Sequence, residues 1–203
     1  MMKRFLHSLG PAIPVLALGL ASACALAPVS TNFTGRSLGS GKVGLDGGAV
    51  AAGSGMFYGR LAVGLGPNLD LGAQYDMLSA GLFAKYSIIN NTESGFSLAG
   101  FAGAGKAVNG HYIYAGPAIS FKAGMIEPYF AARFNWVHYG ENKSSSGFDI
   151  SAGDYSYLQF TAGSVLWFSR AVGLNAEFSY FSGTTGSTQL VGPIICGGLK
   201  LRL

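Results

Sequence analysis

The side chains best suited to catalysis in this chain are two histidines and three aspartates. His111 and His138 lie in segments of alternating polar and apolar residues, and Asp76, Asp149 and Asp154 lie at or near the ends of such segments. A histidine can act as a general base only when an acid or a nucleophile lies within hydrogen-bond reach, and nothing in the sequence fixes such a neighbour. Both histidines also share the parity of the apolar residues around them, as an ordinary ring on an apolar surface would. We therefore expect that the protein is not an enzyme, with a hydrolase built on these residues as an alternative.

A larger set of polar and charged residues recurs at alternate positions and could line an internal space. Charges of both signs inside a narrow space normally pair, because an unpaired charge away from water is costly. The sequence therefore predicts an interior filled by ion pairs and a structural or surface role for the protein. The alternative is a narrow pore, in which the surplus of basic residues would weakly favour anions. The predicted interior residues are Arg60, Asp70, Gln74, Asp76, Lys85, Lys122, Arg133, Asn135, Glu177, Lys200 and Arg202.

Several other functions are excluded by the arrangement of the reactive residues. The histidines and cysteines are not clustered, so we predict no metal site. The glycine-rich runs lack the order of a phosphate-binding loop, and we predict no cofactor. The net charge of +4 comes from basic residues scattered singly along the chain, which leaves no basic stripe for nucleic acid.

The elements that must position the interior residues are β-strands. Between residues 155 and 181, apolar side chains such as Phe160, Leu166 and Phe178 alternate with more polar ones, and a short link interrupts the alternation. A period of two with a tight link indicates a β-hairpin. We expect ten strands, or eight if the glycine-rich first pair does not form a hairpin. The other strands are predicted at 43–52, 57–66, 69–77, 79–89, 96–108, 111–123, 127–139 and 190–203.

The two faces of these strands predict an all-β fold, a transmembrane antiparallel up-and-down β-barrel. Nearly every strand charge falls on one face, and an Arg or Lys on a lipid-facing surface would cost ~2–4 kcal/mol at the bilayer midplane. Apart from the N-terminus, no apolar run approaches the ~20 residues that a spanning helix needs. A soluble barrel with an apolar interior is the alternative. However, only 11% of the residues are charged, whereas a soluble surface carries roughly a quarter to a third.

This pattern resembles small bacterial outer-membrane β-barrel proteins as a class. The resemblance implies a location in the bacterial outer membrane and contact with its lipid. It covers residues 41–203, which we predict to form the barrel, and it does not indicate an oligomeric state.

The N-terminal residues predict export. Two basic residues precede an apolar stretch at 9–20, and the small residues Ala21-Ser22-Ala23 suit a cleavage site. Residues 1–23 are therefore predicted to be a signal peptide. Cleavage there leaves Cys24 first, which resembles a bacterial lipoprotein signal with a lipidated cysteine, although Leu20 lies four residues before it rather than the usual three.

Three further segments complete the organisation of the chain. Residues 24–40 are small, polar and without period, and we predict a flexible periplasmic lead-in. The longest polar segment, 140–154, is predicted to be an outer loop, because outer loops are longer than periplasmic turns. Pro117 and Pro193 fall inside predicted strands, and we expect a β-bulge at each, since proline cannot donate to the strand ladder.

The last strand carries a motif. Gly198, Leu201 and Leu203 fall where the assembly signal of outer-membrane barrels places its glycine and its last two apolar residues. The chain departs from that signal in ending on Leu rather than an aromatic residue, and in having Cys196 where a polar residue is usual. The resemblance implies recognition by the outer-membrane assembly machinery. We expect Cys196 itself to be a small buried side chain.

Overall fold

The computed structural model describes residues 27–51, 56–76, 79–107, 109–140, 152–185 and 192–203. The predicted signal peptide (1–23), Cys24 and Asp149 lie outside these described residues, so their predicted roles stay predictions. No helix in the described ranges is long and apolar enough to cross a membrane.

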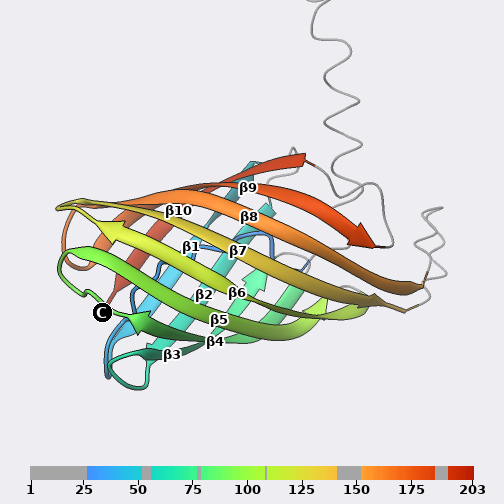
Figure 1. The fold of residues 1–203 in the computed structure, drawn as a ribbon, viewed down its shortest axis with the longest axis horizontal. Coiled ribbons are helices and arrows are strands. Elements are labelled where there is room, and N and C mark those ends of the chain that lie inside the picture. The colour runs from blue at the N-terminus through green and yellow to red at the C-terminus, as the bar shows by residue number, and fades with distance from the viewer. Residues whose placement is uncertain (1–26, 52–55, 77–78, 108, 141–151, 186–191) are drawn as a thin grey trace, which may run out of the picture.

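The described residues form ten strands in one closed antiparallel barrel (Figure 1). Each strand pairs with its neighbours in sequence, and β1 pairs with β10 to close the wall. The prediction of a ten-stranded up-and-down barrel is therefore confirmed, and the eight-stranded alternative is wrong because the glycine-rich first pair belongs to the wall. The strands are β1 (Val43–Ala51), β2 (Met56–Gly64), β3 (Leu69–Asp76), β4 (Ser79–Ile89), β5 (Gly95–Ala107), β6 (Gly110–Lys122), β7 (Ile126–Tyr139), β8 (Gly153–Trp167), β9 (Val172–Thr185) and β10 (Gly192–Arg202).

The two ends of the barrel differ in what lies there. At one end, which we call the C-terminal mouth, Leu203 exchanges backbone hydrogen bonds with Val43, and four short turns connect the strands. At the other end, the opposite mouth, β7 ends at Tyr139 and β8 begins at Gly153. Most of the predicted outer loop falls in residues 141–151, outside the described part of the chain.

The strand faces separate side chains in the sense that the sequence predicts. Large apolar side chains point outward, and those of Phe57 and Leu82 remain 66% and 68% exposed. Polar side chains point into the lumen, where Arg133 and Gln159 are almost fully buried. Because neighbouring strand residues point to opposite faces, the alternation in sequence becomes an apolar exterior and a polar interior. The described wall therefore lacks the apolar interior and polar exterior that the alternative of a soluble barrel requires.

Wall glycines make room for tyrosine rings in the lumen. A Cβ added at Gly163 would lie 2.4 Å from the ring of Tyr129, and a Cβ at Gly48 or Gly198 would lie 2.8 or 2.5 Å from the hydroxyl of Tyr58. These contacts are too close for a side chain at those positions. The glycines thus let large rings fill a narrow barrel at close packing.

The β-bulges expected at the two prolines are absent. The register between β6 and β7 is the same on both sides of Pro117, and only Gly116 and Pro117 drop out of the pairing. Pro193 pairs with Tyr180 of β9, and the register of the β9–β10 ladder is the same on both sides of it. Within the described ladders the register shifts instead at one point in β4 and one in β8.

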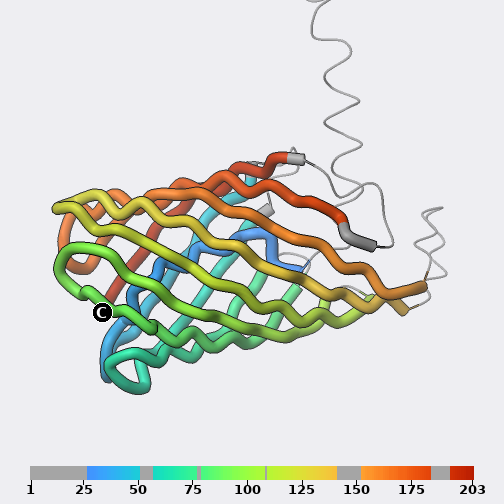
Figure 2. The backbone as a smooth tube through the Cα atoms, viewed as in Figure 1, coloured from blue at the N-terminus to red at the C-terminus, as the bar shows by residue number. Residues whose placement is uncertain are grey.

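Residues 27–38 run through the lumen, and the flexible lead-in predicted for residues 24–40 is therefore wrong for this part. Every side chain from Ala27 to Ser37 is buried, and Figure 2 shows this blue segment inside the barrel. We call residues 27–38 the plug. It leaves the lumen at the C-terminal mouth to join β1, and it extends toward the opposite mouth, where the N–H of Ala27 donates to the hydroxyl of Tyr157 at 3.1 Å. The polar residues without period are ordered because the polar lumen supplies their hydrogen-bond partners.

Candidate functional site

The interior residues predicted from the alternation lie in the lumen or at its C-terminal mouth. Three of the eleven are half-buried: Asp76 accepts a hydrogen bond from the N–H of Val29 in the plug, and Lys122 and Arg202 line the C-terminal mouth. Most of the set contacts the plug, which the alternation could not predict. The other eight are buried: Arg60, Asp70, Gln74, Lys85, Arg133, Asn135, Glu177 and Lys200.

A buried ion pair holds the plug near the C-terminal mouth. The guanidinium of Arg36 binds both carboxylate oxygens of Glu127, with Nε donating to Oε1 at 2.6 Å and Nη2 donating to Oε2. Arg36 Nη1 also donates to the carbonyl oxygen of Thr92 at 2.9 Å, and Trp167 Nε1 donates to Glu127 Oε2 at 2.8 Å. Arg36 and Glu127 are 1% and 0% exposed. A bidentate pair with further hydrogen bonds is the arrangement that can offset the cost of burying both charges.

Two wall lysines bind the plug backbone. Lys85 Nζ forms an ion pair with Asp70 at 3.1 Å and donates to the carbonyl oxygen of Arg36. Asp70 in turn accepts from the hydroxyl of Ser37 at 2.6 Å. Lys200 Nζ donates to the carbonyl oxygen and to Oδ1 of Asn32, at 3.0 and 2.8 Å. The lumen charges therefore satisfy main-chain groups of the plug, which would otherwise be buried without partners.

Glu177 binds the middle of the plug. Its two carboxylate oxygens accept hydrogen bonds from the N–H groups of Thr31 and Asn32, at 3.0 and 2.8 Å, and Oε2 also accepts from the hydroxyl of Tyr129 at 2.9 Å. Asn32 has a φ of 40°, in the left-handed region that asparagine tolerates better than most residues. Successive N–H groups beside such a residue form a concave anion-binding site. Here the anion is a side chain of the wall.

A network of side-chain amide, hydroxyl and guanidinium groups continues this contact toward the opposite mouth. Gln159 Nε2 donates to the carbonyl oxygen of Val29 at 2.7 Å, and Arg133 Nη2 donates to the carbonyl oxygen of Pro28 and to Gln159 Oε1. The hydroxyl oxygens of Thr31 and Thr161 lie 3.0 Å apart and are hydrogen-bonded. Side chains of β7 and β8 thus bind the backbone of Pro28 and Val29 and the side chain of Thr31.

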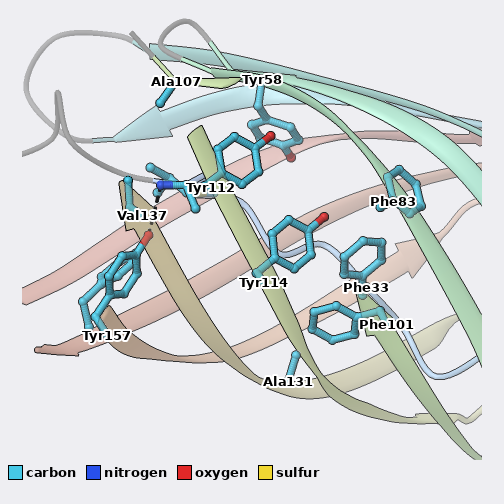
Figure 3. Close-up of a cluster of buried hydrophobic side chains, with 14 of the residues drawn as sticks. Phe33, Tyr58, Phe83, Phe101, Ala107, Tyr112, Tyr114, Ala131, Val137 and Tyr157 are labelled. Atoms are coloured by element: carbon cyan, nitrogen blue, oxygen red, sulfur yellow. Dashed lines mark hydrogen bonds between the residues drawn. The ribbon is translucent and has the colours of Figure 1, made fainter. Parts of the chain in front are cut away.

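Among residues 27–38, the plug carries one aromatic residue, and its ring packs against rings of the wall in the lumen. Phe33 lies between Phe83 and Phe101, with ring centroids 5.0 and 4.5 Å away (Figure 3). The guanidinium carbon of Arg60 lies 4.1 Å from the centroid of the Phe33 ring, within cation–π range. This cluster adds apolar contact to a plug that is otherwise held by polar groups.

The charges of the described wall are nearly balanced. The alternation predicts six basic and three acidic residues, and the structure adds Glu127 and also Asp46, whose carboxylate lies 3.5 Å from Lys200. The lumen-facing side of the described wall therefore carries six basic against five acidic side chains, so the predicted basic surplus of three falls to one. The balance removes most of the physical reason to expect an anion-selective pore.

Comparisons with known proteins show similar folds and no family. No family model matches the chain, and no curated protein matches it. Among solved structures, the N-terminal β-barrel domain of Pseudomonas aeruginosa OprF is 12% identical, covers 81% of this chain and 99% of its own, and gives a TM-score of 0.44. Ail, the attachment invasion locus protein of Yersinia pestis, is 11% identical with 81% and 99% coverage and a TM-score of 0.39. Neisserial surface protein A is 16% identical with 80% and 96% coverage and a TM-score of 0.40. Likeness at these scores indicates no function for this chain.

The residues of the alternative hydrolase are brought together only in part. His138 and Asp154 form a hydrogen bond of 2.7 Å between Nδ1 and Oδ1 on the outward face, and the ring of His111 lies beside that of His138. Asp76 lies on the inward face, where it binds the plug. No three His, Cys, Asp or Glu residues of the described chain are grouped as metal ligands would be. The hydrolase stays a prediction.

Glu127 and Arg36, which form the buried ion pair, are not among the residues predicted from the sequence. Glu127 has the same parity as Arg133 and Asn135 in its strand, so the alternation could have identified it as an interior acid. Arg36 lies in a segment without period, and no sequence signal marks it. Cys196 is a buried free thiol, as expected from the sequence.

Proposed function

We propose that this chain is a bacterial outer-membrane barrel with a structural or surface role, whose lumen is sealed by its own plug. One observation carries the proposal: the described wall exposes apolar side chains to its surroundings and buries its polar ones around the plug. Exposed apolar surface on this scale is unfavourable in water, and a lipid bilayer is the solvent that matches it. The opposite mouth is assigned to the outside, because the longest predicted loop lies there.

The plug supports a closed barrel over an open pore. It occupies the lumen with buried residues, and its contacts are spread from Arg36 near one mouth to Ala27 toward the other. Inside the barrel, beside Arg60 and Lys85, the cavity between plug and wall measures about 40 Å³, whereas a wider space of about 530 Å³ lies at the C-terminal mouth beside Arg36 and Lys122. The inner cavity of 40 Å³ holds only a few water molecules, which is too little for a hydrated solute.

Location and sealing are tested by separate measurements. Cell fractionation with boiled and unboiled electrophoresis samples is expected to place the folded chain in the outer-membrane fraction with heat-dependent mobility. Recovery in the soluble periplasmic fraction would remove the membrane proposal.

Planar bilayers then test the seal. The wild-type chain is expected to show no steady conductance, and a variant lacking residues 27–38 is expected to conduct with little charge selectivity, because the wall charges nearly cancel. Equal conductance of the two proteins would show that the plug does not seal the lumen.

A further inference from the structure

The outward face of the barrel carries one row of titratable residues near the opposite mouth. Lys106 of β5 pairs with His111 of β6, His111 pairs with His138 of β7, and His138 pairs with Asp154 of β8. Directly paired residues of antiparallel strands point to the same face with Cβ atoms about 5 Å apart. These four residues, which we call the outer row, therefore lie side by side across four neighbouring strands.

The outer row is the only place where the described strands put a Lys, Arg, His, Asp or Glu side chain outward. In the remaining described strand positions, each Lys, Arg, Asp and Glu has inward parity, and the outward positions hold mainly apolar, small or aromatic residues. Lys106, His111 and Asp154 are exposed, and the His138 side chain is 44% exposed. Chance scatter of outward charges would not collect all of them at one level of the barrel.

Contacts within the outer row set how the rings of His138 and His111 are placed. His138 Nδ1 lies 2.7 Å from Asp154 Oδ1, and because an ionised carboxylate only accepts, Nδ1 is the donor. The Nε2 atom of His138 is then on the side of the ring that faces away from Asp154. The ring centroid of His111 lies 4.9 Å from that of His138 and 5.6 Å from that of Trp136. Lys106, whose ammonium is on a long flexible chain, completes the row next to His111.

The depth of the outer row in a bilayer follows from the free-energy cost of exposing a lysine to lipid. A lysine facing lipid costs about 2–4 kcal/mol at the midplane but about 0–1 kcal/mol near the interface. Lys106 and His138 are each one residue from the end of their strands, so they lie at the edge of the apolar belt. Trp136, one outward position further from the mouth, has the ring type that favours the interface. The row therefore lies at the depth of lipid headgroups.

We propose that the outer row binds the phosphate group of an anionic lipid headgroup in the leaflet around the opposite mouth. The proposal rests on the proposed membrane location. A lysine ammonium is a point charge suited to phosphate, and a protonated imidazole adds N–H donors. Lys106 and His138 lie on either side of His111, two strand spacings or about 10 Å apart. Their side chains can therefore both reach one phosphate that lies over His111. The Asp154 carboxylate at the end of the row binds His138 and leaves the Lys106 end for the anion.

The test compares lipids that differ only in the headgroup. The full-length folded protein is reconstituted in nanodiscs containing phosphatidic acid and phosphatidylcholine with the same acyl chains, and the lipids that stay bound are counted by native mass spectrometry. The wild type is expected to retain phosphatidic acid preferentially. The variant carrying Lys106→Gln, His111→Gln and His138→Gln is expected to lose that preference by about tenfold or more, the scale of a lost charge-assisted contact. Lys106→Arg is expected to keep it.

The controls separate this proposal from its alternatives. Lys42→Gln removes an exposed lysine in the turn before β1, at the C-terminal mouth, and is expected to retain phosphatidic acid as the wild type does. Heat-dependent gel mobility shows that each variant is folded. An unchanged preference in the triple variant, or an equal loss in Lys42→Gln, would overturn the outer row as the binding site. Because the nanodisc supplies the bilayer, these results are independent of the cell fractionation that tests location.

Discussion

Replacing Arg36 with Met is expected to destabilise the barrel strongly, although Arg36 lies in a segment without secondary structure. The substitution removes two hydrogen bonds to Glu127 and one to the carbonyl oxygen of Thr92. Glu127, which is 0% exposed, then keeps only the N–H of Trp167 as a partner in this cluster. Breaking a buried ion pair by removing one partner costs about 3–5 kcal/mol, because the other charge remains buried. We expect Arg36→Met to lower the free energy of unfolding by that amount.

A double-mutant cycle shows whether the buried charge is the cause. Glu127→Gln keeps an oxygen that can accept from Trp167 but carries no charge. The Arg36→Met and Glu127→Gln double variant is therefore expected to lose only neutral hydrogen bonds, about 1–2 kcal/mol, and to be more stable than Arg36→Met alone. The free energies come from urea unfolding in lipid vesicles, followed by circular dichroism.

Arg170 provides the matched control for this cycle. It is an exposed arginine in the turn between β8 and β9 at the same mouth, and Arg170→Met is expected to change stability by less than about 0.5 kcal/mol. If Arg36→Met cost less than about 1 kcal/mol, or if the two single effects simply added in the double variant, the plug would not be held by a buried ion pair.

Two further substitutions test how closely the plug fits the wall. A Cβ at Gly35 would lie 2.3 Å from the backbone oxygen of Ser97. Gly35→Ala is therefore expected to push the plug away from β5 and to produce conductance in planar bilayers. Gly100→Ala is the control, because a Cβ there would have nothing within 4 Å, and this variant should remain closed. Similar conductance from both variants would contradict the close contact. Thr31→Cys combined with Thr161→Cys is expected to form a disulfide under mild oxidation, because the two hydroxyl oxygens lie 3.0 Å apart. Peptide mapping by mass spectrometry detects the disulfide-linked peptides, and each single variant serves as a control. If the double variant formed no disulfide, Thr31 would not lie beside Thr161 and the plug would lie elsewhere.

Much of the wall was predictable from residue order. The alternation at Phe160, Leu166 and Phe178 is a local property of the chain, since neighbouring strand residues must point to opposite faces. It assigned Arg133 and Glu177 to the interior, and the structure places both there. The same rule extended to Asp46 and Glu127 would have corrected the charge balance of the lumen. Direct pairing of Lys106, His111, His138 and Asp154, by contrast, depends on the register of three separate strand pairs, which alternation alone does not fix.

The sequence by itself determined most of the strand segments and their polar and apolar faces, because both follow from the period of two along the chain, whereas closure with ten strands was decided by the pairing of β1 with β2 and β10. Only the tertiary structure decided what fills the barrel. The N–H of Asn32 meets Glu177 across 145 residues of sequence, and a segment without period carries no local signal for such a partner. Residues 27–38 are ordered because a lumen already lined with charges and amides offers hydrogen bonds to a polar backbone, and that lumen exists only once the ten strands have closed.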